Sequence, residues 1–289
     1  MSQKLNILLF TLISQLAIGQ NTILWKVTDT INDKTSHIVG TYHQFGNSFV
    51  DSLPKIKDVL LKSELAVFES IDNYDEIIEQ RNSSNVIEKE IKKKDLKRLK
   101  QIAKGWKVDL YKLKPIEIAL KLNQETIKSK CNTTIKEDKF DHFDKYLIQL
   151  AKKNKVEVMG LETFEVQLKS LVEQFNNYDW KKLRQEIGKG ISQYENNDEF
   201  NNLCKVANEY RKFDLNYELD KTCQPSVLIT ERNANWMQVI PELIQKKNTF
   251  IAVGYFHLKW ECGILEQLKK LGFKVEPIKI KLAANNGYK

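Results

Sequence analysis

Two apolar segments near opposite ends of the chain finish in the same short pattern, Gly-x-x-His. Residues 37–43 read HIVGTYH, and residues 250–257 read FIAVGYFH. Apolar runs of this kind are typical of buried strands, so each terminal histidine is expected just beyond the carboxyl end of a strand. In α/β folds, ligands bind at that edge of the sheet. Because the chain has only four histidines, the repetition predicts that His43 and His257 meet at one site.

The chain around each motif predicts a strand–helix–strand unit. The N-terminal unit follows a first strand that forms a hairpin with it, and its last strand leads directly into Glu69. The expected N-terminal elements are the strands Thr22–Thr28 and His37–Tyr42, the helix Ile56–Lys62 and the strand Leu65–Phe68. The expected C-terminal elements are the strand Thr249–Tyr255, the helix Gly263–Leu271 and the strand Phe273–Ile280.

The middle of the chain, about residues 74–247, is predicted to be helical apart from one short strand, Val156–Met159. The helical spacing of apolar residues supports this assignment. The expected helices are Tyr74–Lys104, Leu110–Lys130, Phe140–Lys153, Thr163–Asn176, Trp180–Ser192, Glu199–Leu219 and Ser226–Gln245. We therefore expect an α/β fold in which two βαβ-like halves build a mixed central sheet, with a large helical insertion between them.

The first 19 residues are predicted to be a signal peptide. Lys4 precedes an apolar run, Leu5–Gly19, whose end, Ala17-Ile18-Gly19, has the small-x-small pattern of a cleavage site. The run is about 15 residues long, whereas a spanning helix needs about 20. An uncleaved anchor is the alternative. We expect an exported periplasmic or extracellular protein, with no stable membrane insertion after cleavage and with residues 20–289 as a single domain.

The positive charge does not indicate a nucleic-acid partner. The formal net charge is +8, but the lysines are spread along the whole chain. The densest basic run, residues 92–100, alternates with Leu96 and Leu99 at helical spacing, which is typical of a solvated helix face.

The four cysteines are Cys131, Cys204, Cys223 and Cys262. An exported protein can oxidise them, and four cysteines allow three pairings. Cys204 with Cys223 is the expected local bridge, although the sequence leaves the pairing open. No spacing of cysteines and histidines indicates a zinc site held by thiolates.

The strand ends bring together a donor set for a metal ion. His43, Glu69 and His257 each follow a predicted strand, so two imidazoles and a carboxylate are expected to converge. Such ligands suit manganese, iron, cobalt or zinc, and three protein ligands leave positions open for water. A metal-bound water is acidified and becomes a hydrolytic nucleophile. The sequence thus predicts metal-assisted hydrolysis with a divalent ion such as Mn, Co or Zn.

For four other polar residues, the sequence allows two structural or functional roles each. Glu162 is either a helix-capping acid or a carboxylate that supports the site or acts as a base. Arg232 either pairs with an interior carboxylate or binds substrate. Asp144 either orients a site histidine or caps a turn. Glu261 shares the face of His257 if the chain there is helical, and is otherwise solvated. His37 is expected to be structural and His142 to be solvated.

Four blocks of residues, in order along the chain, resemble the TraB/GumN family, which also includes the Tiki membrane metalloproteases. The blocks are Gly40–His43 with Leu53-Pro54 and Val67–Glu69; Asp144, Leu147 and Ala151 with Gly160–Thr163 and Gln167; Glu231–Asn233 with Trp236; and Val253–Leu258 with Glu261, Gly263, Gly272-Phe273 and Pro277. The resemblance implies an α/β fold related to erythromycin esterase and ChaN-like proteins. For the Tiki branch, it implies divalent-metal-dependent proteolysis through the two Gly-x-x-His motifs and an acidic residue. The chain departs from the pattern at Trp260, where a small glycine is common, and it has no C-terminal membrane helix.

The resulting functional hypothesis is an exported metal-dependent hydrolase, a peptidase whose substrates are peptides or proteins. His43, Glu69 and His257 are the expected metal ligands, and Glu69, Glu162 and Arg232 are the expected catalytic residues. Two alternatives remain open. One is a metal-independent, esterase-like hydrolase in which His43 and Glu69 activate water or a hydroxyl. The other is an exported protein that binds haem, iron or a peptide in the same cleft.

Overall fold

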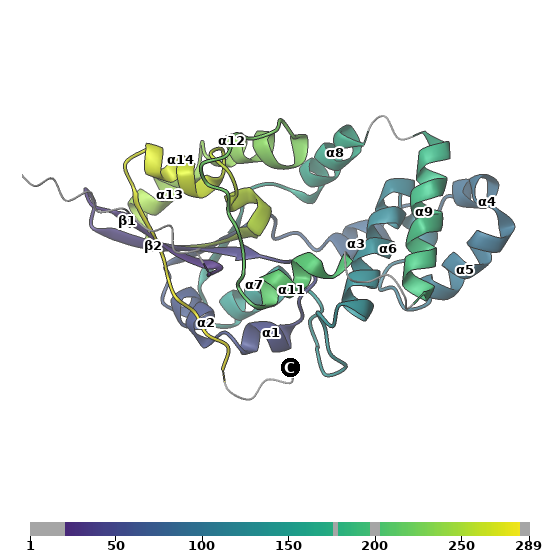
Figure 1. Ribbon diagram of the computed structural model, residues 1–289, viewed down its shortest axis with the longest axis horizontal. Coiled ribbons are helices and arrows are strands. Elements are labelled where there is room, and N and C mark those ends of the chain that lie inside the picture. The colour runs from purple at the N-terminus through teal and green to yellow at the C-terminus, as the bar shows by residue number, and fades with distance from the viewer. Residues whose placement is uncertain (1–20, 176–178, 197–202, 284–289) are drawn as a thin grey trace, which may run out of the picture.

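The computed structural model describes residues 21–175, 179–196 and 203–283. Within these residues, the chain forms one mixed sheet in the order β4-β3-β5-β2-β1-β6, with helices around it (Figure 1). The strands are β1 (Leu24–Asp29), β2 (Lys34–Thr41), β3 (Leu65–Phe68), β4 (Glu157–Gly160), β5 (Thr249–Gly254) and β6 (Lys274–Pro277). The α/β class and the mixed sheet predicted from the sequence are confirmed.

The strands that carry the two motifs lie side by side. β2 and β5 pair in parallel, with Thr41 opposite Gly254. β3 pairs in parallel with β5 on its other side and with β4 at the edge. β1 pairs antiparallel with β2, as the predicted hairpin requires, and antiparallel with β6. The two βαβ-like ends of the chain therefore interleave, since β5 of the C-terminal end lies between β2 and β3 of the N-terminal end.

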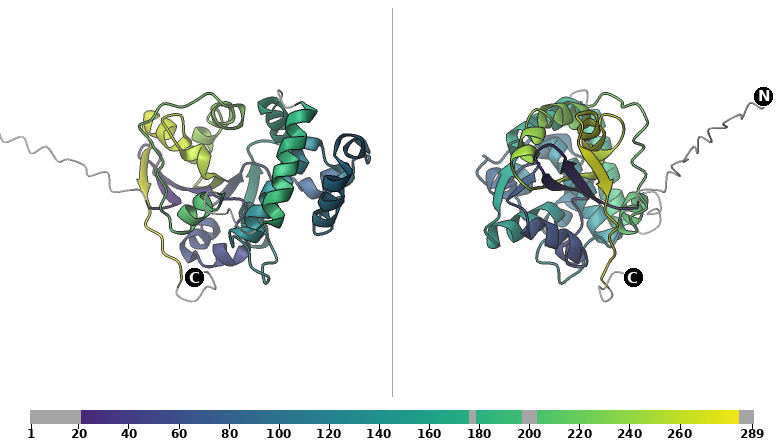
Figure 2. Two further views of the ribbon diagram at one scale, coloured as in Figure 1. Left: turned by 45° about the vertical axis from the view of Figure 1, so that its right-hand side comes forward. Right: turned by 90° about the vertical axis from the view of Figure 1, so that its left-hand side faces the viewer.

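Both faces of the sheet are covered, which explains why its central strands read as continuous apolar runs. All four residues of β3 are buried, as are the first five of β5. Figures 1 and 2 place one group of helices against each face. One group is α1 (Asn47–Asp51), α2 (Pro54–Leu61), α7 (Phe143–Lys153) and α11 (Lys205–Arg211); the other is α12 (Arg232–Trp236), α13 (Ile240–Lys246) and α14 (Ile264–Lys270).

A third group of helices lies beyond the sheet and forms a separate layer with its own apolar cluster. This layer, called the helical layer below, contains α3 (Tyr74–Glu79), α4 (Val86–Glu90), α5 (Lys93–Ala103), η1 (Leu110–Lys112), α6 (Pro115–Lys130) and α9 (Trp180–Glu195). Its core includes Ile87, Leu99, Ile118 and Ile187, none of which is more than 1% exposed. Between the helical layer and the sheet lie α8 (Phe164–Gln174) and the π-helical turn η2 (Val227–Glu231).

Some predicted helix boundaries were wrong. Tyr74–Lys104 is three helices, because residues 82–85, Asn-Ser-Ser-Asn, favour turns over helix. The helix predicted from Leu110 begins at Pro115, since proline fits the first helical position but not the interior. The helix predicted over Glu199–Leu219 starts partly outside the described residues, and its described part ends at Arg211, shortly before the positive φ of Phe213.

The predicted bridge between Cys204 and Cys223 was also wrong. Cys131 bonds to Cys204, and Cys223 bonds to Cys262. The first bridge joins the end of α6 to the start of α11, and the second holds the turn that follows the C-terminal motif. Cys204 and Cys223 are close in sequence but not in space, because the chain between them runs across the sheet before it reaches Cys223.

Among the residues that the structure describes, no helix is both long and apolar enough to cross a membrane. The predicted signal peptide, residues 1–19, lies outside the described residues.

The packing of the two motifs gives a test of the fold. A Cβ added at Gly40 would lie 2.9 Å from Leu258 Cδ1 and 3.0 Å from Tyr255 Cβ, so Gly40→Ala overpacks the contact between the motifs. We expect it to lower the free energy of unfolding by about 1–3 kcal/mol. Gly188→Ala is the matched control, because nothing lies within 4 Å of its Cβ position on α9. In a helix interior, that change should stabilise by about 0.5–1 kcal/mol. Urea denaturation of both variants tests the pair, and equal effects would contradict the packing argument.

Candidate functional site

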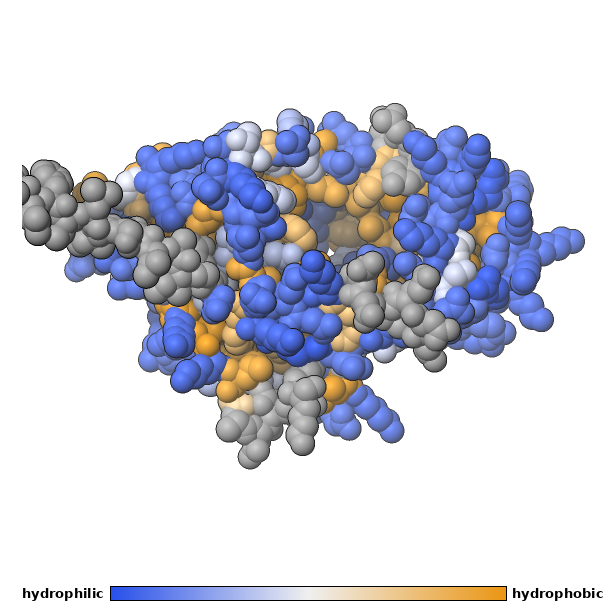
Figure 3. Space-filling model, in the orientation of Figure 1, coloured by the Kyte–Doolittle hydropathy of each residue, from blue (hydrophilic) through white to orange (hydrophobic). Residues whose placement is uncertain are grey.

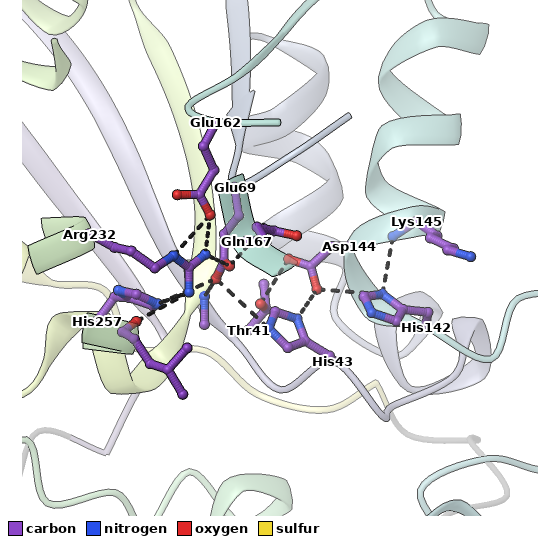
Figure 4. A network of polar contacts seen from close by, with 12 residues as sticks. Thr41, His43, Glu69, His142, Asp144, Lys145, Glu162, Gln167, Arg232 and His257 are labelled. Atoms are coloured by element: carbon purple, nitrogen blue, oxygen red, sulfur yellow. Dashed lines mark hydrogen bonds and ion pairs between the residues drawn. The ribbon is translucent and has the colours of Figure 1, made fainter. Parts of the chain in front are cut away.

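The carboxyl ends of four parallel strands meet at one edge of the sheet. His43 follows β2, Glu69 follows β3, Glu162 follows β4, and His257 lies in the 3-10 turn η3 (Tyr255–Leu258) that follows β5. Figure 4 shows these side chains converging, together with Asp144 from α7 and Arg232 from α12. The structure thus brings the three predicted metal ligands and the two further predicted catalytic residues, Glu162 and Arg232, into one cluster.

Glu69 is at the centre of this cluster. Its Oε1 accepts a hydrogen bond from the backbone N–H of Gly254 at 2.7 Å. The same oxygen lies 3.8 Å from Nε2 of His43 and 3.8 Å from Nε2 of His257. Burial alone would raise the pKa of Glu69, but the two imidazoles and the Arg232 guanidinium outweigh it and hold that pKa well below its ordinary value. Glu69 is therefore an anion at neutral pH.

The glycine of the second motif leaves room for these groups. A Cβ at Gly254 would lie 3.2 Å from Glu69 Oε1 and 3.4 Å from His43 Nε2. The backbone can therefore pass close to the carboxylate only because this residue has no side chain. This explains why a glycine stands three residues before His257.

His43 is oriented by Asp144. Its Nδ1 donates to Asp144 Oδ2 at 2.6 Å, and Thr41 Oγ1 donates to the other carboxylate oxygen at 2.9 Å. Burial alone would lower the pKa of His43, but the charge of Asp144, its hydrogen bond and the charge of Glu69 raise that pKa to about 9. Of the two readings for Asp144, the structure supports the one in which it orients a site histidine.

His257 is oriented in the same manner by a neutral partner. Its Nδ1 donates to Asn233 Oδ1 at 2.7 Å, and its Nε2 accepts from Nη1 of Arg232 at 3.2 Å. Its side chain is 4% exposed. Burial is the main cause that lowers the pKa of His257, to about 3, with Arg232 contributing. The ring is therefore neutral, and its lone pair is directed into the cluster.

Arg232 links the two carboxylates. Its Nη2 donates to Glu69 Oε2 at 2.6 Å, and its Nε donates to Glu162 Oε1 at 2.9 Å. Trp236 Nε1 donates to the other oxygen of Glu162 at 3.2 Å. Glu162 does not cap α8, because Thr163 is the residue whose side chain accepts from the first turn. Of the roles considered for them, Glu162 is therefore a carboxylate that supports the site, and Arg232 pairs with interior carboxylates.

His43, Glu69 and His257 offer donor types that a divalent metal ion takes, two imidazoles and one carboxylate, and Glu69 Oε1 lies 3.8 Å from each Nε2. Metal-binding histidines usually fix one ring nitrogen to a carboxylate or carbonyl and present the other to the metal. Both rings do this here, since each Nδ1 is anchored and each Nε2 faces the same oxygen of Glu69. Arg232 donates to the lone pair of His257 that a cation needs, so an ion has to displace that hydrogen bond.

Among the described residues, the group of potential ligands whose atoms all lie within 4.8 Å of one another is instead His43, His142 and Asp144. Here, however, His43 Nδ1 and Asp144 are already joined by a 2.6 Å hydrogen bond. That distance is typical of a charge-assisted hydrogen bond from an imidazole to a carboxylate, so we favour Asp144 as the support of a ligand over Asp144 as a ligand.

The prediction that His142 is solvated was wrong. Its ring stacks on His43 with centroids 5.2 Å apart, and its side chain is 20% exposed. It is the first residue before α7, where its Nδ1 accepts from the backbone N–H of Lys145. The sequence contained no clear signal for this, because the N-cap preference would select Asp141 rather than His142.

Sequence reasoning also missed Asn233, whose amide fixes the C-terminal motif through three hydrogen bonds. It accepts from His257 Nδ1 and donates to the backbone oxygens of His257 and Cys262. Two other residues lie apart from the cluster. Glu261 is partly exposed in a turn, and His37 lies on β2 beside Phe250 at the opposite end of the paired segment.

A cavity of about 360 Å³ opens in front of the cluster, between the sheet and the helical layer. His43, Glu69, Arg232, His142 and Asp144 line it on the side of the sheet. His257 and Glu162 lie behind this wall. A substrate in the cavity would therefore meet the faces of His43, Glu69 and Arg232.

A comparison with protein-family models matches the TraB/PrgY/gumN family over residues 23–277. The chain belongs to this family. No curated protein matches the chain. The matched residues include both motifs and every residue of the cluster described above.

The salt bridge between His43 and Asp144 predicts a pH dependence. In the metal-free protein, Asp144→Asn should move the pKa of His43 from about 9 to its ordinary value of 6.5 or below, because burial alone lowers it. The folded pKa of His43 exceeds its unfolded value, so its stabilisation is full below about pH 6.5 and is lost as the pH rises to about 9. Wild type should lose stability across this window, and the variant should lose less.

An NMR titration of the imidazole resonances measures the shift, and denaturation at several pH values measures the stability. His37 is the internal control, since its pKa of about 4 arises from burial and nearby lysines and should not change. An unchanged His43 titration in Asp144→Asn would refute the assigned role of Asp144.

Proposed function

We propose that this chain is an exported metal-dependent hydrolase that cleaves peptides. The observation that carries the proposal is the arrangement of the two motif histidines, each anchored through Nδ1 and each presenting Nε2 to one oxygen of Glu69. Membership of the TraB/PrgY/gumN family is consistent with it, because the two motifs fall within the matched residues.

A divalent ion held by His43, Glu69 and His257 would acidify a bound water and polarise a carbonyl group. The protein's own groups prepare this position. Gly254 N–H and Arg232 hold the two oxygens of Glu69, so the carboxylate does not rotate when its environment changes. Asp144 and Asn233 hold the two rings in fixed orientations.

Arg232 and Glu162 have different roles in this proposal. Arg232 lines the cavity, and its Nη1 contacts Nε2 of His257, the nitrogen that a cation would bind. Once a cation displaces that contact, Nη1 is placed to donate to a substrate oxygen. Glu162 does not line the cavity. It acts through Arg232, whose guanidinium it holds in place together with Trp236.

The metal-independent alternative is less well supported by the geometry. In that reading, His43 has to accept a proton from water or a hydroxyl. Asp144 and Glu69 instead raise its pKa to about 9, so the metal-free ring is already protonated at neutral pH and is a poor base. A cation at Nε2 would have to displace the same proton, so metal binding should strengthen as the pH rises.

Metal binding is the first test. The mature protein should bind one divalent ion per chain, and His43→Ala or His257→Ala should lower its affinity at least about 100-fold, because each removes one of three ligands. Isothermal titration with Mn²⁺, Co²⁺ and Zn²⁺, together with elemental analysis, measures this. His37→Ala is the matched control, since His37 lies on the same strand as the first motif but outside the cluster. Absence of binding by the wild-type protein would sink the proposal.

Hydrolysis is the second test. A peptide library incubated with the protein and Mn²⁺ or Co²⁺ should be cleaved, and chelation should stop the cleavage. Glu69→Gln should reduce kcat/KM by at least about 100-fold, because it removes the one anionic ligand of the three proposed for the ion. Glu261→Gln serves as the control, since that residue lies in a partly exposed turn away from the cluster. Cleavage that persists after complete metal removal would contradict the metal-dependent mechanism.

A further inference from the structure

We propose that the helical layer, together with α8 and η2, provides the site with a binding pocket for a large apolar side chain of the peptide substrate. The choice of a peptide as substrate rests on the proposed function, but the binding of an apolar side chain does not. The pocket is the part of the 360 Å³ cavity that extends from His43 and Glu69 towards α6.

The walls of this pocket are leucines from three separate elements. Leu120 on α6, Leu171 on α8 and Leu228 on η2 line the cavity and are each partly exposed. Ile78, Leu113 and Leu168 lie in the same walls and are 5%, 6% and 9% exposed. Figure 3 shows apolar residues around the hollow between the sheet and the helical layer. Partly exposed leucines that face one another gain free energy when an apolar group covers them.

The charged groups of the same walls are already paired within the chain. Asp75 binds Lys145 at 2.7 Å, and Lys121 binds Glu125 at 3.0 Å. Asp72 accepts from the backbone N–H of Phe164 at 2.7 Å. Asp75 and Lys121 would have to break these ion pairs to bind a charged substrate side chain, which favours an apolar one along this part of the walls.

Glu117 is a lining residue with one buried carboxylate oxygen that has no hydrogen-bond partner in the described chain. Its Oε2 accepts from Arg81 at 2.8 Å and from the backbone N–H of Lys114 at 2.6 Å, whereas its Oε1 is buried without a hydrogen-bond partner. A lysine or arginine of the substrate could pair with this oxygen. It would, however, enter beside two like charges, because Arg81 contacts Glu117 and Lys121 lies one helical turn away on α6. We therefore argue that the pocket takes an apolar side chain of the substrate and not a lysine or arginine.

The size of the cavity also limits the substrate. About 360 Å³ lies at the lower end of the range for small-molecule pockets, about 300–1,000 Å³. Such a space admits one large side chain with its adjoining backbone, but not a folded element. The substrate therefore presents an extended, unfolded segment to His43 and Glu69, with an apolar residue next to the bond that is cut.

Binding can be measured independently of hydrolysis. Ligand-observed NMR with the full-length mature protein should detect N-acetyl-leucine amide and not N-acetyl-lysine amide. Leu171→Asp should weaken the binding of the leucine compound at least about tenfold, because it places a charge in the apolar wall. Val172→Asp is the matched control: it introduces the same charge on the same helix, at a residue that is 40% exposed and outside this cavity. Leu120→Asp repeats the test from the opposite wall should Leu171→Asp fail to fold.

The outcomes separate this inference from the proposed function. Equal binding of the leucine and lysine compounds, preferred binding of lysine, or unchanged binding in both leucine variants overturns the apolar pocket. Cleavage of the peptide library without preference for leucine or phenylalanine beside the cut bond also overturns it, while leaving the hydrolase in place. Selective binding without any cleavage supports the pocket and overturns the proposed peptidase activity.

Discussion

The arrangement of the site depends on one buried carboxylate. Glu69 is 8% exposed and carries a negative charge at the point where four strands end. A buried charge is tolerated only when it is paired and hydrogen-bonded, and removing one partner of such a pair typically costs about 3–5 kcal/mol. Glu69 meets this condition through Arg232 and the backbone of Gly254. Its other oxygen also faces the two imidazoles, although Arg232 Nη1 contacts Nε2 of His257 at 3.2 Å.

The parallel pairing of β2 and β5 is what brings the imidazoles together. Thr41 lies opposite Gly254, so the two motifs leave the sheet side by side although more than 200 residues separate them in sequence. The glycines then serve different purposes. Gly254 leaves space for Glu69, whereas Gly40 lets the first motif pack against Tyr255 and Leu258 of the second. A side chain at either position would push the histidines apart, which gives a physical reason for glycine three residues before each histidine.

The strands and the residues at their ends could be predicted from the sequence, because both follow from local patterns. Apolar runs defined β2, β3 and β5, and the polar residue after each run indicated His43, Glu69 and His257. The residues that support these groups from other elements were not accessible in this way. Asn233 and Trp236 lie on α12, and nothing in their neighbourhood in sequence indicates that His257 and Glu162 are their partners. The disulfides were missed for the same reason, since Cys131 and Cys204 meet only after α6 and α11 have packed.

Trp260 shows how the structure can explain a departure from the family pattern. Its φ of 67° lies in the left-handed region, which glycine adopts freely and other residues adopt at a cost of about 1–2 kcal/mol. That conformation explains why a glycine suits this position. In this chain, the indole Nε1 donates to Glu218 at 3.2 Å and the backbone N–H donates to Tyr217 at 2.9 Å. The tryptophan thus gains contacts that offset the strain, in the turn that the Cys223–Cys262 bridge also holds.

The sheet and the helical layer contribute different parts of the site. The sheet supplies the groups that would bind a metal ion, and these are fixed by backbone register and by buried hydrogen bonds that tolerate little change. The helical layer has a separate apolar core and contributes only one wall of the cavity. Its residues can therefore vary without disturbing Glu69 or either histidine. In this chain, substitutions in α3, α6 and the facing side of α8 should therefore change which side chain the cavity admits while leaving the groups at the strand ends in place.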